Sequence, residues 1–238
     1  MGMFPRNLLP EVFTLVGRHC EDAQNGAAIL GIMPEKSERA ERRTQQQRRE
    51  ATIAKLVDAA IDTIIEDGYY RTTIAAICGR AGVSAGALFR HFESRLALIA
   101  VVAEEISRRI LAEADGVLAV PRDERAPQVE SALRLLAGLA GSPLVDAWHE
   151  MMVAARTDRE LRERIAPALP RFYDGILVRA KALGALDGLP ESVHELAAFS
   201  LTHLFSGAAL TGSVYPRPDL DARRIPLAVA WIRSTPEL

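Results

Sequence analysis

The 238 residues are 49% hydrophobic and 25% charged, a composition that excludes a disordered or fibrous chain and fits one or two globular domains with a real core. The formal net charge of −2 gives no global basic excess, although residues 39 to 95 hold ten Lys and Arg against seven Asp and Glu, as a solvated face also could. Cys20 and Cys78 lie far apart without metal-like spacing and no apolar run could span a bilayer, so we expect a cytoplasmic protein without disulfides or a membrane segment.

Residues 1 to 32 mix apolar and polar side chains without a sustained period. Met33 directly precedes a charged segment that would make a plausible N-terminus, so a tail and an over-extended start remain equally open. Residues 34 to 50 are polar and rich in Arg and Gln. They could form a disordered or fraying helical arm, or Arg48 and Arg49 could lie against DNA phosphates. We predict a flexible tail over residues 1–44.

The next segment predicts an amphipathic helix of about four turns, because apolar residues from Ile53 to Ile65 recur at offsets of three and four. Asp67 and Gly68 end this helix, and Gly68 suits the left-handed position that follows a helix C-terminus.

Residues 72 to 92 predict two short helices joined by a tight turn at Gly82. Thr73 or Thr72 can cap the first helix, and Ser84 can cap the second. The apolar positions at helical spacing are Ile74, Ile77, Ala81, Leu88 and Phe92. This pattern is a helix-turn-helix, whose second helix can enter the DNA major groove. An ordinary helical hairpin in a globular core would satisfy the same pattern.

A longer helix begins after Ser94, and from about residue 100 helix follows helix without strand-like alternation. Thr157 and Glu160 have the spacing of a capping box, and Pro190 suits a first helical turn. The predicted breaks are Gly116 to Pro127, Gly141 to Pro143, Thr157 to Asp158, Pro167 to Pro170, Gly184 to Pro190 and Gly212 to Pro218. We therefore predict an all-α fold: an N-terminal three-helix helix-turn-helix domain over 45–95, joined by a long helix to a C-terminal bundle of five or six helices over 96–238.

The helix-turn-helix resembles that of the TetR-like (tetracycline-repressor-like) bacterial transcriptional regulators. The residues that carry the resemblance are Ala59-Ala60, Glu66 to Tyr69, Thr72-Thr73, Ile77, Ala81 to Ser84, Gly86, Leu88-Phe89, His91-Phe92 and Ser94. Three positions depart from the family pattern: Phe89 replaces the usual Tyr, Arg95 the usual Lys and Cys78 the usual Ala. Phe89 lacks a hydroxyl for a phosphate, Arg95 keeps the charge, and Cys78 is most simply a small buried hydrophobe, with a redox-sensing thiol as the alternative.

The second short helix predicts a DNA-reading surface that is almost free of side chains. Small residues let its backbone sit deep in the groove, Arg90 can pair with guanine, and the methyl groups of Ala85 and Ala87 can meet thymine methyls. We assign Thr73, Ser84, His91 and Arg95 to phosphates, although His91 could equally be a surface histidine. The predicted DNA-binding residues are Thr73, Ser84, Ala85, Gly86, Ala87, Phe89, Arg90, His91, Arg95, Arg48 and Arg49.

The C-terminal half shows no catalytic, cofactor or metal signature. His149-Glu150 and His194-Glu195 lack a second histidine four residues on, so the helical zinc pattern is absent. We predict that the chain is not an enzyme; a helical small-molecule enzyme stays open as an alternative, and it would need His149 and Glu150 beside His203 with a bound metal.

The resemblance implies a pocket for a small effector in the C-terminal half, and we predict Trp148, Met152, Phe172 and His203 in its wall; plain core packing is the alternative. It also implies that the last two helices pair with their symmetry mates in a dimer, although a monomeric core is possible. The expected protein is a homodimeric repressor that a small molecule releases from a palindromic operator of double-stranded DNA. A ligand-independent regulator or an activator of the same fold is the alternative.

Overall fold

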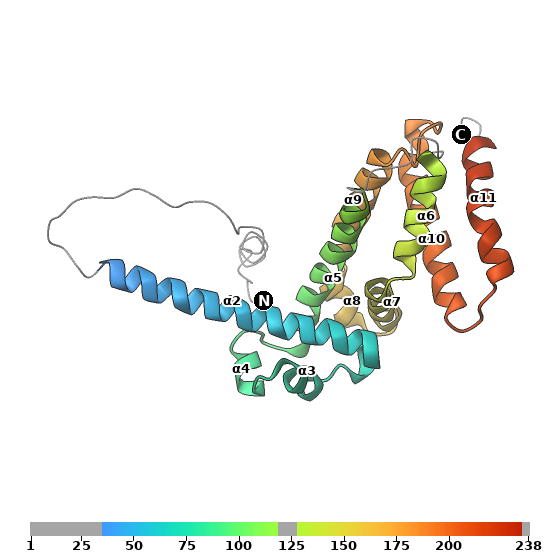
Figure 1. Ribbon diagram of the computed structural model, residues 1–238. Helices are drawn as coiled ribbons and strands as arrows, with labels where there is room; N and C mark the ends of the chain where they lie inside the picture. Colours follow the sequence, from blue (N-terminus) through green and yellow to red (C-terminus); the bar gives the residue numbers. More distant parts are fainter. Residues whose placement is uncertain (1–34, 119–127, 235–238) are drawn as a thin grey trace, which may run out of the picture. The chain divides into compact units, whose positions relative to one another are not determined.

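The computed structural model describes residues 35–118 and 128–234, and within these ranges the regular elements are helices, with no strand (Figure 1). This confirms the predicted all-α fold class. The chain divides into two compact units, one ending at Lys55 and the other beginning at Leu56. The predicted tail over 1–44 lies outside the described residues as far as residue 34. None of the described helices is both long and apolar enough to cross a membrane.

The first helix, α2 (Glu35–Asp67), includes the polar arm that the sequence left open between disorder and helix. Glu, Arg and Gln are good helix formers, and the side chain of Gln46 donates a hydrogen bond to Glu50 at 2.7 Å, one turn away. From Leu56 onward the helix buries an apolar stripe that includes Ile61 and Ile64, as its spacing predicts.

Two glycines shape the corner that follows. Gly68 has φ 81° and ψ 164°, so it takes a glycine-only extended conformation instead of the predicted left-handed helical one. It leads into the 3₁₀ turn η1 (Tyr69–Arg71). Gly82, with φ 66° and ψ 33°, is left-handed as predicted and separates α3 (Ile74–Ala81) from α4 (Ala85–Phe89).

The caps of the two short helices agree with the sequence. Thr73, not Thr72, caps α3 by accepting a hydrogen bond from the amide of Ala76 at 3.2 Å. Ser84 caps α4 in the same way through the amide of Ala87, also at 3.2 Å. These side chains fix where each helix begins.

The long helix α5 (Arg95–Leu118) follows, and the described chain then continues as six further α-helices and one short 3₁₀ turn. They are α6 (Gln128–Ala140), α7 (Pro143–Ala155), α8 (Arg159–Ile165), α9 (Ala168–Ala182), η2 (Glu191–Val193), α10 (His194–Gly212) and α11 (Pro218–Ser234). The predicted breaks after α6, α7, α9 and α10 are confirmed, and the one from Gly116 to Pro127 lies outside the described residues from residue 119 onward. Helix α9 begins at Ala168, so Pro170 lies in its first turn. The predicted capping box is wrong: Asp158 caps α8 by accepting from the amide of Leu161 at 3.0 Å, and Thr157 instead donates to the Ala154 carbonyl.

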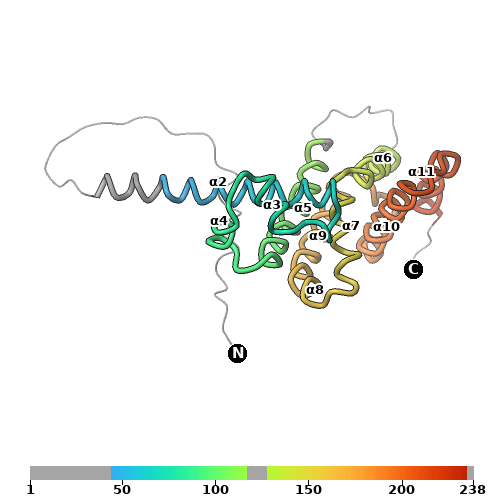
Figure 2. The backbone as a smooth tube through the Cα atoms, turned by 90° about the horizontal axis from the view of Figure 1, so that it is seen from below, coloured from blue at the N-terminus to red at the C-terminus, as the bar shows by residue number. Residues whose placement is uncertain are grey.

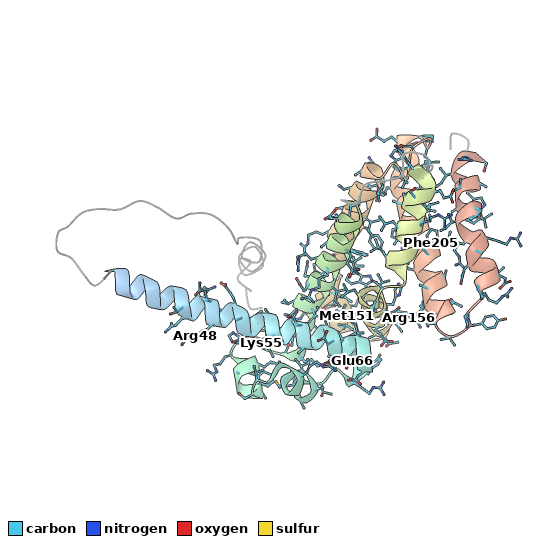
Figure 3. The ribbon with its side chains drawn as sticks, in the orientation of Figure 1. Arg48, Lys55, Glu66, Met151, Arg156 and Phe205 are labelled. Atoms are coloured by element: carbon cyan, nitrogen blue, oxygen red, sulfur yellow. The ribbon has the colours of Figure 1, made fainter. Side chains whose placement is uncertain are left out.

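Two groups of helices build the C-terminal part. Helix α5 packs against α7, α8 and α9, while α6 packs against α10 and α11 (Figure 2). Gly175 lets α9 approach α5 closely, because a Cβ atom there would lie 2.6 Å from Cδ1 of Leu111. Buried apolar side chains join α6, α10 and α11, with Phe205 among them (Figure 3). A cavity, which is described below, lies among α5, α6, α7, α9 and α10.

Candidate functional site

Helix α4 presents a face with almost no side chains. Ser84, Ala85 and Gly86 are exposed and Ala87 is half-buried, while Leu88 points into the core. The Ser84 and Thr73 hydroxyls accept their capping bonds through oxygen, so each keeps its own hydrogen to donate. Such a surface can approach another backbone closely and donate to acidic oxygens along its edge.

Larger side chains follow at the end of α4. The guanidinium of Arg90 is exposed, and its Nε makes only a long 3.4 Å bond to the Gly86 carbonyl. The Phe89 ring is 53% exposed. His91 is half-buried at the edge of this surface. The first compact unit carries Arg48 and Arg49, both exposed on α2. The DNA contacts of all these residues stay predictions.

Arg95 has an internal role that the sequence did not reveal. Its Nε donates to the Thr72 carbonyl at 2.6 Å, Nη2 to the Tyr69 carbonyl at 2.8 Å and Nη1 to the Tyr69 hydroxyl at 3.0 Å. The guanidinium carbon also lies 4.4 Å from the centre of the Tyr69 ring, a cation–π distance. Burial raises the pKa of Tyr69. Arg95 thus fastens the start of α5 to the corner at η1, and its predicted phosphate contact stays a prediction.

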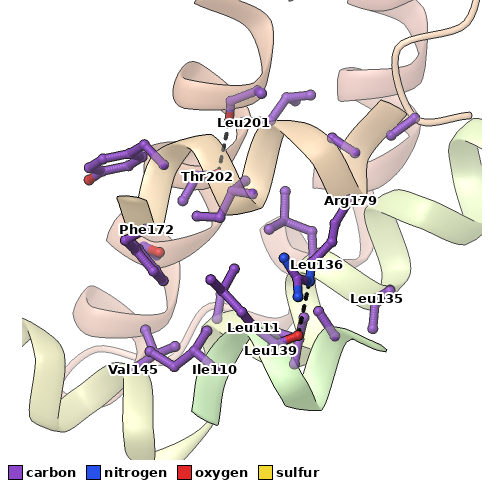
Figure 4. Close-up of a pocket in the computed structure, with 18 of the residues that line it drawn as sticks. Ile110, Leu111, Leu135, Leu136, Leu139, Val145, Phe172, Arg179, Leu201 and Thr202 are labelled. Carbon is purple, nitrogen blue, oxygen red and sulfur yellow. Dashed lines mark hydrogen bonds between the residues drawn. The ribbon is translucent and has the colours of Figure 1, made fainter. Parts of the chain in front are cut away.

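The C-terminal half contains a cavity of about 280 Å³. The structure brings all four predicted pocket residues, Trp148, Met152, Phe172 and His203, to its wall. Figure 4 shows Phe172 on one side of the cavity and Arg179 on another. Whether these residues bind a ligand stays a prediction.

The prediction missed several wall residues that helical spacing would have found. On α7, Val145 and His149 lie on the face of the predicted Trp148 and Met152, at offsets of three and four. On α9, Tyr173, Ile176, Arg179 and Leu183 continue the face of Phe172. The wall residues on α5, α6 and α10 could not be predicted from local spacing, because these helices come from distant segments of the chain.

The polar groups of the wall are mostly engaged within the protein. Nδ1 of His203 lies 2.7 Å from the Phe199 carbonyl, and its Nε2 lies 3.2 Å from the Tyr173 hydroxyl. Burial raises the pKa of Tyr173. Burial lowers the pKa of His149, and its neighbour His203 lowers that pKa further while Asp146 opposes the shift. The lowered pKa of His149 favours its neutral form at neutral pH.

Helix α7 links this cavity to the helix-turn-helix corner. One face carries Trp148 and Met152 into the cavity wall. Glu150 lies between these two residues in the sequence, and its Oε2 accepts a hydrogen bond from the Tyr69 amide at 3.2 Å. A Cβ atom on Gly68 would lie 3.2 Å from the same oxygen, so glycine is needed there both for its positive φ and for this approach.

Glu150 and the neighbouring carboxylates do not gather into a metal centre. Among the described residues no group of three or more His, Cys, Asp or Glu side chains could hold an ion. Glu150 does not line the cavity that contains His149 and His203. The buried thiol of Cys78 has its pKa raised by burial, which confirms a small buried hydrophobe and disfavours the reactive thiolate.

Comparison with known proteins gives consistent results along most of the chain. Residues 56–102 match the family model described as bacterial regulatory proteins, tetR family. An uncharacterised HTH-type transcriptional regulator of Mycobacterium bovis is 42% identical over 193 residues, which cover 81% of this chain and 98% of that protein.

Solved structures share the fold at low identity. A TetR-family regulator from Rhodococcus sp. is 21% identical with a TM-score of 0.60, covering 77% of this chain and 99% of its own. The multidrug binding protein EbrR, solved in complex with imidazole, is 18% identical with a TM-score of 0.54, covering 77% of this chain and 96% of its own.

Proposed function

Because the chain belongs to the TetR family of bacterial transcription regulators, we propose that it is a homodimeric repressor that leaves a palindromic operator when a small molecule enters the cavity. The observation that carries this proposal is the double role of α7. The same helix forms part of the cavity wall and, through Glu150, holds the corner of the helix-turn-helix.

The proposed DNA contact uses the small-residue face of α4. Ala85, Gly86 and Ala87 let the helix enter the major groove, where Arg90 can reach a guanine edge with two parallel hydrogen bonds. Thr73 and Ser84 would donate their hydroxyl hydrogens to flanking phosphates. These groups all lie on or beside the turn that the caps and Gly82 fix.

The proposed dimer uses the outer faces of α10 and α11. Both helices expose large apolar side chains on one stripe each, at offsets close to multiples of a helical turn. They are Leu196, Phe199 and Leu210 on α10, and Leu220, Leu227 and Trp231 on α11. Exposed apolar residues gathered in this way are typical of a contact between protein chains. A two-fold dimer would place two reading helices on one palindrome.

Release requires that the ligand prefer one conformation. A ligand that bound the operator-competent and released conformers equally would shift nothing, however tightly it bound. Since Glu150 stands one position from wall residues of α7, a displaced α7 changes the support of Tyr69 and Gly68. Tyr69 is hydrogen-bonded to Arg95 at the start of α5, so a shift of Tyr69 would be passed on to α5.

The proposal also assigns the chain no catalytic role and places it in the cytoplasm, with the DNA. The alternative is a regulator without a ligand or an activator. The variant Ala132→Leu, which fills part of the cavity, separates a ligand-free regulator from a ligand-released one. A ligand-released regulator should keep its operator binding in this variant but no longer be released by the effector, whereas a ligand-free regulator should behave as before.

The first test is selection of random DNA by the purified full chain, followed by sequencing of the bound molecules. We expect a palindromic consensus whose half-sites lie about one helical turn, roughly 34 Å, apart. Small molecules are then screened for release of that operator. Folded protein that binds DNA without any consensus would overturn the repressor, whereas a consensus that no molecule releases would favour the ligand-independent regulator.

A further inference from the structure

The wall of the cavity is mainly hydrocarbon and carries no unbalanced charge in the described part of the chain. Leucine, isoleucine, alanine and aromatic side chains make up most of it. None of its described residues is an Asp or a Glu, and its one formal cation is Arg179. A buried charge on a ligand must be paired to be tolerated, so this inventory decides which ligands fit.

Three of the five N–H groups of Arg179 are engaged within the protein, and Asp115 balances its charge. Its Nε donates to the Leu111 carbonyl at 3.0 Å (Figure 4). Its Nη2 pairs with the carboxylate of Asp115 at 2.5 Å, and Nη1 donates to the Gly175 carbonyl at 3.1 Å. Each nitrogen of the guanidinium is engaged, and Asp115 balances the charge. Arg179 therefore serves to join α9 to α5.

Tyr173 and His203 offer a hydrogen bond to a ligand without carrying charge. A carbonyl oxygen only accepts, so Nδ1 of His203 must donate to Phe199, and in the neutral ring Nε2 must accept from the Tyr173 hydroxyl. The Tyr173 oxygen keeps a lone pair that can accept from a ligand. Thr202 is less available, because its hydroxyl already donates to the Ala198 carbonyl at 2.8 Å.

His149 adds a second polar group on the same wall. Its Nδ1 is buried without a hydrogen-bond partner, an arrangement that is costly in a folded protein. His149 and His203 both line this cavity. Two neutral polar positions thus meet an otherwise apolar cavity.

We propose that the cavity selects an uncharged, compact, mainly hydrocarbon or aromatic molecule with one hydrogen-bonding group, which meets the Tyr173–His203 pair and His149. This inference rests on the proposed function only in taking the cavity as the effector site. The aromatic rings of Trp148, Phe172 and Tyr173 supply flat apolar contact for such a molecule.

The test measures binding by isothermal titration calorimetry of the full chain without DNA, using four probes on one carbon skeleton. They are naphthalene, naphthol, naphthoate and naphthyltrimethylammonium. We expect naphthol to bind tightest, about fivefold tighter than naphthalene through one net hydrogen bond. We expect the anion and the cation to bind at least about tenfold more weakly than naphthol, because neither finds an opposite charge. A charged probe that binds tightest, or no binding of any probe, would overturn the inference.

Variants of the wall test whether the Tyr173–His203 pair binds the polar group of the ligand. The double change Tyr173→Phe with His203→Phe keeps aromatic volume and removes the pair, so naphthol should lose its advantage over naphthalene while naphthalene binds as before. Tyr215→Phe is the matched control, because this tyrosine is exposed and does not line the cavity. An unchanged naphthol preference in a folded double variant would refute the assignment.

The pH dependence provides an independent check. The charged or titratable groups that share a cavity wall with His149 are Asp146 and Glu150 on its own helix, Tyr173 and the balanced Arg179 on α9, His203 on α10, and Glu66, Asp67, Tyr70 and Arg71 at the corner of the helix-turn-helix. Naphthol affinity should stay flat from about pH 8 to about pH 7, because the burial-lowered pKa of His149 keeps that ring neutral over this range. A carboxylate ligand would instead take up a proton with a histidine and bind more tightly as the pH falls. These titrations contain no DNA, so a negative result would overturn the ligand inference alone. The repressor proposal is tested separately by the selection of operator DNA.

Discussion

At the residue scale, Arg90 is the side chain that we expect to read sequence. Replacing it with Ala should weaken binding to the selected operator by about 1–3 kcal/mol, roughly 5- to 150-fold, and relax the consensus at one base pair. Binding to random DNA should fall far less. Competition electrophoresis against both DNAs at one salt concentration measures the difference.

The control for Arg90 is Arg134→Ala, which removes the same charge from an exposed position on α6. It should leave the ratio between operator and random DNA unchanged. An equal loss for both DNAs in the Arg90 variant would mean that this side chain contacts phosphate alone.

Arg95 is expected to act on stability as well. Arg95→Ala removes three hydrogen bonds and the contact with the Tyr69 ring, so we expect the free energy of unfolding to fall by about 2–3 kcal/mol. Arg95→Lys should lose less, because an ammonium can replace part of the fork but not its planar geometry. Urea unfolding followed by circular dichroism gives both values.

An exposed arginine serves as the comparison for Arg95. Arg159 pairs with Glu163 on the surface of α8, and its replacement by Ala should leave the unfolding midpoint where it is. If Arg95→Ala were equally silent, the corner at Tyr69 would not depend on the guanidinium.

At the element scale, α7 is the helix whose contacts should transmit ligand binding. Glu150→Ala deletes the acceptor for the Tyr69 amide, so ligand affinity should change less than about twofold while the ligand's effect on operator affinity falls about fivefold or more. Glu150→Gln keeps an acceptor oxygen and should keep most of the effect. Titrations of ligand with and without operator measure the coupling directly.

Glu160→Ala on α8 removes an exposed carboxylate from a neighbouring helix and should leave the coupling intact. Full coupling in the Glu150→Ala variant would show that the signal takes another route.

The elements themselves could be predicted wherever local chemistry decides them. The caps at Thr73 and Ser84 and the left-handed turn at Gly82 follow from residue type and spacing. Thr157 was wrong as a cap because Asp158, one residue on, places a carboxylate within reach of the Leu161 amide. Local patterns could not distinguish two neighbouring candidates that both fit.

The cavity and the corner depend on contacts between distant segments, and these set the limit of prediction. Arg95 matches a position where the family carries a cation, but its turn toward Tyr69 needs a corner that only the folded chain provides. Likewise, Glu150 is an ordinary exposed helix residue in the sequence, and its partner lies 81 positions earlier. Such long-range pairs leave no periodic trace.

At the scale of the whole molecule, the exposed apolar stripe on α11 predicts a dimer. Leu227→Glu places a charge in this stripe, so we expect a shift from dimer to monomer in analytical ultracentrifugation and a loss of affinity for the full palindrome of about 100-fold or more. A single half-site should be bound as before.

The matched change Ala222→Glu adds the same charge to an exposed position of α11 that lies away from the stripe. It should leave the dimer intact. A Leu227→Glu protein that still sediments as a dimer would move the interface away from α11.

The two tryptophans of the chain occupy very different surroundings. Trp148 is 4% exposed in the cavity wall, whereas Trp231 is 52% exposed on the outer face of α11. The fluorescence of each tryptophan therefore reports a different event. In the Trp231→Phe variant the emission comes from Trp148 and reports occupancy of the cavity. In the Trp148→Phe variant it comes from Trp231 and reports the loss of water from the outer face of α11 when subunits associate. The chain holds its own pair of optical probes, so effector entry and subunit association can each be timed in its own single-tryptophan variant without attaching a dye.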